Sequence, residues 1–557
     1  MPFQVRRCLL RAALIACSGA AMATQAGSVP AAGESRLQQQ DGAAIRSLLV
    51  AAAQGTAERG NAYRLRELAE RFYAERGFVP AWFEGNTPRK QALQVLALLQ
   101  GAASHGLDPA DYDAARLAER LRGAGGTRGA APAEAASIDV ALTLSLFRWL
   151  SDLHVGRVGP RELRVLIDLP QERLDLVKAV REAIAADRLP ELAAMAAPRL
   201  RTYDRLREAL ARYRQLAAEL AADPLPAVRK LEPGMPYAGL AALHRLLVAL
   251  GDLPASAPLP SGYEGELVDA VRRFQARHGL EADGVIGRKS FEQLDVPLAQ
   301  RVRQIELALE RLRWLPPLRS EKAVVINIPE FRLRALEVRD GAAAVRLGMN
   351  IIVGRALVTQ TPMFIGSMRH VEFSPYWNVP ASIARKEIIP KLRRDPAYLA
   401  REEMEFVGAG GVTTEVSEEN LEALARGELR VRQRPGPRNA LGGIKFVLPN
   451  DMDVYLHHTP SVRLFAQSRR DFSHGCIRVE APVELAKFVL AGQQEWNEER
   501  ILAAMAAGTP STVRLARPLP VVVFYTTALV EDDGRVFFLP DIYGHDRALE
   551  RALRERY

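Results

Sequence analysis

The sequence predicts a multidomain α+β protein, with a helical N-terminal half and a mainly β C-terminal domain. Between residues 46 and 222 apolar residues recur at three- and four-residue spacing, for example in 138–153, which is the spacing of amphipathic helices. From residue 321 onward apolar and polar residues alternate, and Asp340-Gly341 supplies a turn, as is typical of strands and hairpins. The change of period near residue 320 therefore separates a helical part from a β part.

The composition is that of an ordinary folded protein. Of the 557 residues, 48% are hydrophobic and 25% are charged. At about 150 residues per domain, this length predicts three or four domains. The formal net charge is +9 and comes mostly from arginines spread along the chain without a basic block. Spread charge of this kind favours an anionic partner over a neutral one and gives no indication of nucleic-acid binding.

The first 23 residues have the pattern of a secretory signal peptide. Three arginines precede a short apolar stretch, and Ala21-Met22-Ala23 is a small-x-small cleavage site. The alternative is a lipoprotein processing box that would leave Cys17 lipidated. Residues 24–45 are rich in Ala, Gly, Gln and Ser and predict a flexible segment. No later stretch has the ~18 apolar residues that cross a bilayer, so we expect no transmembrane segment in the mature chain.

Four further segments follow along the chain. Residues 46–231 are predicted to form a helical scaffold domain, in which we find no catalytic constellation. Residues 232–297 are predicted to form a compact helical unit, and a connecting helix is predicted over 298–320. Residues 321–557 form the mainly β domain, which a charged, partly helical insertion interrupts at 383–437. A long insertion beside a catalytic sequence is typical of a cap over the substrate, and a decorative surface insertion is the alternative.

The unit at 232–297 contains an ordered set of helix and turn residues. Val271, Phe274 and His278 share one helix face, Gly279 suits the end of that helix, and Asp283-Gly284 makes a tight turn. Each residue alone is explained as part of a core or a turn. Together they resemble the three-helix peptidoglycan-binding domain, and the resemblance implies a module that binds the cell wall.

After the leader the chain has a single cysteine, Cys476, in the run Ser-His-Gly-Cys-Ile-Arg at 473–478. A lone cysteine in an exported protein cannot form an internal disulfide. His457 precedes it by about twenty residues, and imidazole titrates in the range that suits a base for a thiol. We expect His457 at the end of one strand and Cys476 at the start of a neighbouring one, so that the imidazole takes the thiol proton.

The neighbours of the cysteine suggest further roles. Gly475 lets a substrate approach the backbone, and the amides of Gly475 and Cys476 are candidates to bind a developing oxyanion. Arg478 lies on the same side of an extended segment and is a candidate to bind a substrate carboxylate. His458 and His370 are interpreted as structural or exposed histidines. Zinc is disfavoured because the sequence has no Cys-x-x-Cys pair and no His-Glu-x-x-His motif.

His457, the gap that follows and the run Ser473-His474-Gly475-Cys476 resemble the signature of the L,D-transpeptidases with a YkuD-type catalytic domain. The order of domains is similar to that of the large periplasmic YcbB-type members, in which a helical scaffold and a peptidoglycan-binding module precede a capped catalytic domain. The runs 376–380 and 455–460 are similar to that subgroup. The general family pattern often has Asn where this chain has Arg478, and an arginine there is similar to the large subgroup.

The resemblance implies a periplasmic enzyme of cell wall biogenesis that forms 3→3 cross-links between peptidoglycan stem peptides and needs no cofactor. Cys476 would attack the carbonyl of the third residue of a donor tetrapeptide and expel the terminal D-alanine, with His457 as base and then as acid. The amine of another stem peptide would then resolve the thioester. Carbapenem-type β-lactams are implied as inhibitors. Lesser roles are assigned to Ser473 and His474, which would shape the site, and to Tyr455 and Trp377, which would form its walls.

Two other functions stay open at this point. An L,D-carboxypeptidase or cysteine peptidase would form the same thioester and pass it to water, and the residues alone do not separate these acceptors. A non-catalytic wall-binding protein would use 232–297 as its anchor, and replacing Cys476 with alanine would then change nothing. The Cys–His set argues against this function, because a binding module has no physical reason to carry it.

Overall fold

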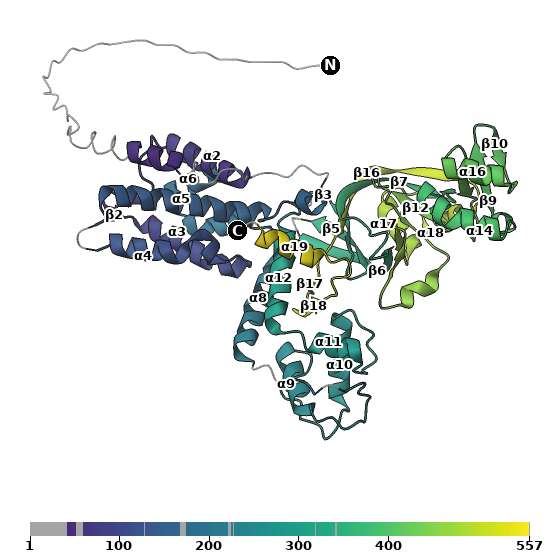
Figure 1. Ribbon diagram of the computed structural model, residues 1–557, viewed down its shortest axis with the longest axis horizontal. Coiled ribbons are helices and arrows are strands. Elements are labelled where there is room, and N and C mark those ends of the chain that lie inside the picture. Colours follow the sequence, from purple (N-terminus) through teal and green to yellow (C-terminus); the bar gives the residue numbers. More distant parts are fainter. Residues whose placement is uncertain are drawn as a thin grey trace, which may run out of the picture.

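The computed structural model describes residues 42–51, 60–126, 129–167, 174–220, 224–226, 228–317, 319–339 and 342–555. Figure 1 shows a helical domain at one end, a β-rich domain at the other, and a small helical module that projects between them. The predicted signal peptide lies outside the described residues, as do residues 24–41 of the predicted flexible segment. Residues 42–45 are already helical, so the helical domain begins earlier than expected.

The N-terminal domain is a helical bundle, as predicted, with one continuous apolar core. Its central helix α5 (Pro132–Val155) starts with a proline, which suits a first helical turn, and is buried along most of its length. No described helix combines the length and the hydropathy needed to cross a membrane. The other elements include α2 (Gly60–Ala74), β1 (Phe83–Glu84), β2 (Thr87–Pro88), α3 (Lys90–Gln100), α4 (Ala114–Ala124), α6 (Leu176–Ala185) and α7 (Leu192–Ala196).

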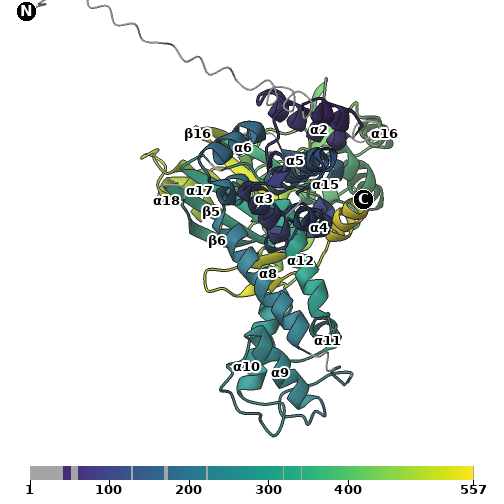
Figure 2. The ribbon, with the colours of Figure 1, turned by 90° about the vertical axis from the view of Figure 1, so that its left-hand side faces the viewer.

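The predicted connecting helix is part of this bundle. Helix α12 (Leu298–Leu312) packs along α8 (Arg201–Glu219), and the two form the stalk that carries the projecting module (Figure 2). Ile305, Ala308 and Leu309 of α12 are buried in the core of the N-terminal domain. An amphipathic helix must bury its apolar face somewhere, and α12 buries it against the scaffold. The chain thus returns to its first domain before it enters the β domain.

Three helices form the projecting module, as predicted, and they enclose a core of their own. They are α9 (Leu240–Leu250), α10 (Glu266–Arg277) and α11 (Arg288–Leu294). Gly279 follows α10 with a φ of +67°, a conformation that costs glycine nothing and so suits a helix end. An antiparallel bridge between Leu231 and Ile286 closes the unit.

The C-terminal domain contains a closed β-sheet. Its strands follow the order β12-β13-β15-β6-β5-β4-β16-β7, and β7 also pairs with β12, so the path returns to its start and has no free edge. The N-terminal domain supplies an extra strand, β3 (Leu166–Ile167), beside β7. The strands of the closed path are β4 (Lys322–Asn327), β5 (Arg332–Arg339), β6 (Ala342–Gly354), β7 (Phe364–Phe373), β12 (Ile444–Val447), β13 (Leu456–His457), β15 (Ile477–Val479) and β16 (Ser511–Phe524).

The C-terminal segment of the β domain contacts both the helical N-terminal domain and the three-helix module. The hairpin of β17 (Ala528–Val530) and β18 (Val536–Phe538) packs into the core of the scaffold. On its other side, the Arg277 guanidinium of the module donates to the Val536 carbonyl (3.1 Å), and the rings of His278 and Phe538 are stacked 5.9 Å apart. The remaining helices of the domain are α17 (Pro482–Leu490), α18 (Glu498–Ala506) and α19 (His545–Arg554).

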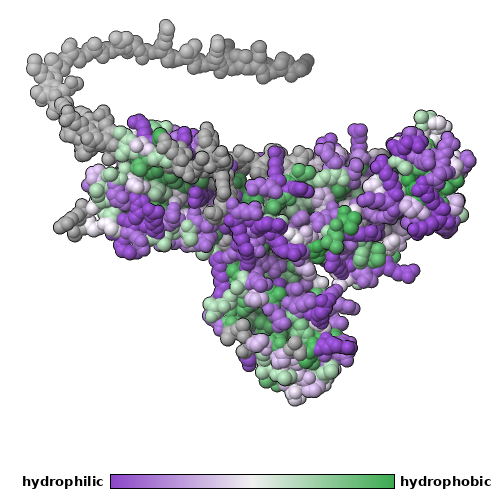
Figure 3. Space-filling view, in the orientation of Figure 1, coloured by the Kyte–Doolittle hydropathy of each residue, from purple (hydrophilic) through white to green (hydrophobic). Residues whose placement is uncertain are grey.

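The insertion is a separate folded unit that is partly helical, as predicted, and also contains a small sheet that was not predicted. It spans residues 377–433 and contains a four-stranded sheet in the order β10-β9-β11-β8, so it starts at β8, before residue 383. It has its own apolar core, and mainly hydrophilic side chains cover its visible surface (Figure 3). Its elements are β8 (Trp377–Asn378), α13 (Ala381–Ile383), the π-helical turn Ala384–Ile388, α14 (Ile389–Arg394), α15 (Tyr398–Arg401), β9 (Met404–Gly408), β10 (Gly411–Thr413), α16 (Glu418–Arg426) and β11 (Arg430–Gln433).

Candidate active site

Two short parallel strands place the predicted catalytic residues on one face of the sheet. Strand β13 pairs with β15, and His457 lies opposite Arg478. Tyr455 and Cys476 directly precede these strands, and the amide of Ile477 donates to the Tyr455 carbonyl (3.0 Å). Side chains alternate along a strand and match between neighbouring strands. Tyr455, His457, Cys476 and Arg478 therefore face the same side, with His457 at the end of β13 and Cys476 before β15, as expected.

The Cys476 thiol lies against the loop before β13. Its Sγ donates to the Asp453 carbonyl at 3.5 Å. Burial raises the pKa of the Cys476 thiol, although hydrogen bonds from Tyr455 and the positive charge of Lys445 act in the opposite direction. Lys445 Nζ lies 4.6 Å from the centre of the Tyr455 ring and 3.1 Å from a carboxylate oxygen of Glu372. The resting thiol is therefore protonated at neutral pH.

His457 is held in the tautomer that a general base requires. Its side chain is buried, and Nδ1 lies 2.5 Å from the His458 carbonyl oxygen. A carbonyl can only accept, so Nδ1 carries the proton and Nε2 has the free lone pair. Burial, together with the charge of Arg478, lowers the pKa of His457 to about 3. The imidazole is thus neutral over the physiological range and able to accept a proton.

In the resting site the thiol and the imidazole each bond to a backbone carbonyl, Asp453 and His458 respectively, and not to each other. The raised pKa of Cys476 and the lowered pKa of His457 both disfavour a thiolate–imidazolium pair. Catalytic hydrogen bonds are often formed only when substrate is bound. Proton transfer is therefore expected in the substrate complex rather than in the free protein.

This resting state predicts that the Cys476 thiol reacts slowly with alkylating reagents. At pH 7.5 we expect iodoacetamide to alkylate Cys476 more slowly than free cysteine, with a rate that rises through pH 9 and above, because the thiolate is the reactive form and burial raises the thiol pKa. Time-resolved intact-mass spectrometry between pH 6 and pH 10 measures this rate. A rate that has already levelled off at pH 6 would indicate a preformed ion pair and contradict the expectation.

The side chain of Ser473 fixes the turn that carries the cysteine. Its Oγ donates to the Cys476 carbonyl (2.6 Å) and accepts from the Gly475 amide (3.1 Å). Gly475 has a φ of +119°, which other residues rarely adopt, so the turn needs glycine at this position. The expected oxyanion role of the Gly475 amide is not supported, because that amide is already bonded to Ser473. Gly475 and Ser473 shape the turn, and the Cys476 amide remains the candidate oxyanion donor.

Two threonines that the sequence did not identify support this turn from outside. Thr359 Oγ1 donates to the Ser473 carbonyl (2.9 Å), and Thr361 Oγ1 donates to the Gly475 carbonyl (2.8 Å). Thr361 in turn accepts from the Gly354 amide at the end of β6 (2.9 Å). No sequence signal pointed to these residues, because their role depends on the loop after β6 folding against a turn more than a hundred residues away.

The remaining predicted residues have different surroundings. Arg478 is half-buried, its Nε has no hydrogen-bond partner, and no carboxylate in the described part of the chain forms an ion pair with it. It is therefore available to a negatively charged group of a ligand. The Tyr455 ring lies 5.7 Å from the His457 ring and forms a wall of the site. Trp377 instead belongs to β8 and packs against the core of the insertion, so its expected place in the wall is not supported.

The side chain of His474 extends from the turn toward the insertion. Its Nε2 lies 2.5 Å from Oε1 of Glu387, in the π-helical turn Ala384–Ile388. Single π-turns in proteins occur frequently at functional sites. The predicted site-shaping role of His474 thus involves a partner from outside the closed sheet.

Buried histidines make the fold sensitive to acid, and besides His105 and His457 they include His278 and His545, whose pKa values burial also lowers. Burial lowers the pKa of His105 and of His457 to about 3 each, so below about pH 6.5 the unfolded chain binds protons that the folded chain does not. Stability is then lost as the pH falls, by about 1.4 kcal/mol for each residue at pH 5.5. Chemical denaturation at pH 7.5 and pH 5.5 measures the effect, and the variant His105→Gln should lose only the share of this residue, about 1.4 kcal/mol. Equal stability at the two pH values would contradict this account.

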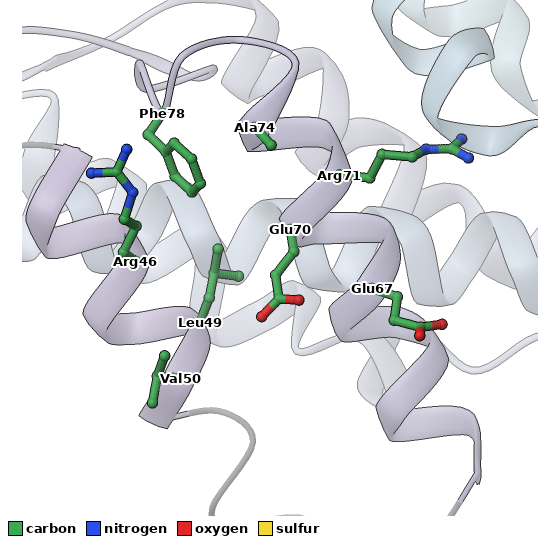
Figure 4. A pocket seen from close by; sticks show the side chains of 8 residues that line it. All are labelled: Arg46, Leu49, Val50, Glu67, Glu70, Arg71, Ala74 and Phe78. Atoms are coloured by element: carbon green, nitrogen blue, oxygen red, sulfur yellow. The ribbon is translucent and has the colours of Figure 1, made fainter.

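A cavity of about 580 Å³ lies outside the β domain, on the helical scaffold. Figure 4 shows Leu49 of the helix at 42–51 opposite Glu70 of α2, with Phe78, from the turn after α2, beside Arg46. None of its lining residues comes from the domain that carries Cys476. The cavity is therefore separate from the site described above.

Comparison with known protein families matches three parts of the chain. Residues 67–210 match a scaffold domain, residues 238–294 a peptidoglycan binding domain, and residues 321–513 the L,D-transpeptidase catalytic domain of the YkuD family. The last match contains the turn at 473–476, His457 and the whole insertion. It also agrees with the resemblance drawn from the sequence.

Relatives support the same assignment. A Haemophilus influenzae protein that carries the provisional name L,D-transpeptidase is 31% identical over 250 residues, which is 45% of this chain and 49% of that protein. The match thus spans about half the length of this relative. Among solved structures, an L,D-transpeptidase from Xylanimonas cellulosilytica is 16% identical and covers 54% of this chain and 99% of its own, with a TM-score of 0.17. A Bdellovibrio bacteriovorus protein is 11% identical and covers 42% and 56%, with a TM-score of 0.16.

These TM-scores are low, so the assignment rests on the sequence matches and on the motif that they contain. The helical module agrees with the peptidoglycan-binding match in both extent and fold. The chain therefore carries a YkuD-type L,D-transpeptidase catalytic domain together with a peptidoglycan-binding domain.

Proposed function

We propose that the protein is a peptidoglycan L,D-transpeptidase that forms 3→3 cross-links through a thioester on Cys476. The observation that carries the proposal is the parallel register of β13 and β15, which sets His457, Cys476 and Arg478 on one face of the sheet. A nucleophile, a neutral imidazole with a free Nε2 and an unpaired guanidinium on one face are the groups that acyl transfer from a carboxylate-bearing peptide requires.

In the first half-reaction, Nε2 of His457 accepts the thiol proton as Sγ attacks the carbonyl carbon of the third residue of the donor stem. The Cys476 amide donates to the oxyanion of the tetrahedral intermediate. Collapse breaks the bond to the terminal D-alanine, whose amine takes the proton from His457. Arg478 binds a carboxylate of the donor, which orients the scissile bond.

In the second half-reaction, the side-chain amine of another stem peptide attacks the thioester carbonyl. His457 now accepts a proton from this amine, and Sγ leaves and is reprotonated. The products are a 3→3 cross-linked dimer and the free enzyme. No redox step or additional co-reactant is needed, because the energy of the donor amide is kept in the thioester.

The same thiol supports two further parts of the proposal. A carbapenem-type β-lactam would acylate Cys476 by opening of its strained ring, and this would block the site. The leader at 1–23 would direct the protein to the periplasm, where the stem peptides lie, and the module at 238–294 would hold it on the polymer.

Product analysis tests the proposal against hydrolysis. The purified mature protein is incubated with disaccharide-tetrapeptide, and the products are separated and identified by mass spectrometry. We expect a dimer of one tripeptide and one tetrapeptide stem. A product consisting only of the shortened tripeptide stem would favour an L,D-carboxypeptidase, and an unchanged substrate that stays bound would favour a wall-binding protein.

A further inference from the structure

In the described part of the chain, the insertion makes one side-chain hydrogen bond to the catalytic turn, in addition to the contacts at its base. At the base, Asn439 is fully buried and its amide donates to the carbonyls of Pro375 and Arg434 (3.0 and 2.9 Å), which ties the two connecting segments together. A second attachment, to the catalytic turn, is the hydrogen bond that Nε2 of His474 donates to Oε1 of Glu387. The insertion is therefore attached at its base and at Glu387.

The turn at 473–476 is held on its remaining sides by groups of the catalytic domain itself. Ser473 bridges it internally, and Thr359 and Thr361 hold two of its carbonyls. His474 is the residue of the turn whose side chain is not used in this way, and its imidazole reaches out to Glu387. The insertion thus supplies the contact that the catalytic domain does not.

The chemistry of the contact determines which ring nitrogen of His474 carries a proton. A carboxylate at neutral pH can only accept, so Nε2 of His474 is the donor. Nε2 of His474 and Oε1 of Glu387 lie 2.5 Å apart, and a hydrogen bond to a charged acceptor is stronger than one between neutral groups. Both side chains are about one-third exposed, so the contact sits at the surface between the insertion and the turn and can open without unfolding either unit.

We infer that Glu387 is a positioning residue, which holds the insertion on the catalytic turn through His474 and so sets the geometry in which Cys476 receives the donor peptide. The inference rests on the proposed function and adds to it a specific task for the insertion. The π-helical turn supports this assignment, because the additional residue in a π-turn changes the direction in which a side chain such as Glu387 projects.

A double-mutant cycle tests whether Glu387 acts through His474. The rate of thioester formation with disaccharide-tetrapeptide is measured by intact-mass spectrometry for the parent, Glu387→Ala, His474→Ala and the double variant. We expect Glu387→Ala to be slower by about tenfold or more, the size expected for the loss of one hydrogen bond to a charged group. The double variant should be no slower than His474→Ala, whereas multiplied losses would overturn the inference.

Two further variants separate positioning from general damage to the fold. Glu387→Gln keeps an oxygen that accepts from Nε2, so it should recover most of the lost rate. Glu418→Gln removes a carboxylate from the same insertion, where it pairs with Arg393 at the surface, and should leave the rate within about twofold of the parent. A Glu418→Gln loss as large as that of Glu387→Ala would contradict the assignment.

Amide hydrogen exchange gives a readout that does not depend on catalysis. In Glu387→Ala we expect faster exchange both in the turn at 473–476 and in the segment 384–394, with the rest of the sheet unchanged. Unchanged exchange in both segments would overturn the inference even if the parent is active. A third outcome separates the two proposals. If exchange is faster in Glu387→Ala but the parent forms no thioester, the proposed function is refuted, whereas the contact between the insertion and the turn is established.

Discussion

Replacing His457 with glutamine should lower the rate of thioester formation by about 10²- to 10⁴-fold, the usual contribution of a general base. His457 is the neutral imidazole on the same face of the sheet as Cys476, and its Nδ1 donates to the His458 carbonyl, which leaves Nε2 for the thiol proton. Glutamine fills a similar volume and can still donate to that carbonyl, but it cannot take a proton. Intact-mass spectrometry of samples quenched at successive times measures the rate at which the acyl-enzyme forms in the variant and in the parent.

The matched control is His370→Gln. His370 lies on β7 of the same sheet, 3.5 Å from a carboxylate oxygen of Glu372, and has no part in the proposed reaction. We expect its rate within about twofold of the parent. Alkylation of Cys476 by iodoacetamide should change little in His457→Gln, because burial and not His457 dominates the pKa of the resting thiol. A His457→Gln variant that acylates at the parental rate would remove His457 from the mechanism.

The largest expected loss of stability follows replacement of Glu310 by leucine or alanine. Glu310 is fully buried in α12, bonded to Arg313 (2.6 Å), to the amide of Val158 (3.1 Å) and to Arg157. Burial alone would raise the pKa of Glu310, but the two arginines and the backbone amides outweigh it and lower that pKa. Removing the carboxylate leaves the buried Arg313 guanidinium without its counter-charge, while Arg157 keeps Asp111, and the loss costs about 3–5 kcal/mol.

Chemical denaturation of the full chain measures this loss against a surface control. Glu484→Ala removes one partner of an exposed pair with Lys487 and should change the free energy of unfolding by less than about 1 kcal/mol. Because α12 joins the scaffold to the β domain, loss of Glu310 should also make the two domains unfold at different denaturant concentrations. Equal stability of the Glu310 variant and the parent would contradict the role assigned to this cluster.

The grouping of the proposed catalytic residues on one face of the sheet was predictable because they are close together in the sequence. The turn at 473–476 is contiguous, His457 precedes it by fewer than twenty residues, and alternation along a strand places Arg478 beside Cys476. The step from helical to β structure was also predictable, because a change of period marks a change of secondary structure, and the three-helix module was predicted from its resemblance to the peptidoglycan-binding domain. Local pattern was sufficient for these features.

The features that were not predicted depend on contacts between distant parts of the chain. Thr359 and Glu387 reach the turn from a loop and from the insertion, and nothing in their local sequence indicates it. The pairing of β7 with β12, which closes the sheet, spans the whole insertion. The engaged Gly475 amide was missed for a related reason, since the hydrogen bond from it depends on how Ser473 turns back within the motif.

The most direct test of the account is whether Cys476 carries an acyl group during turnover. The purified mature protein and its Cys476→Ala variant are mixed with disaccharide-tetrapeptide, and the intact masses are followed over the first turnovers. The account predicts that the parent gains the mass of the disaccharide-tripeptide acyl group while one equivalent of D-alanine is released, and that the variant gains nothing. An unmodified parent in the presence of product, or the same adduct on the variant, would contradict it.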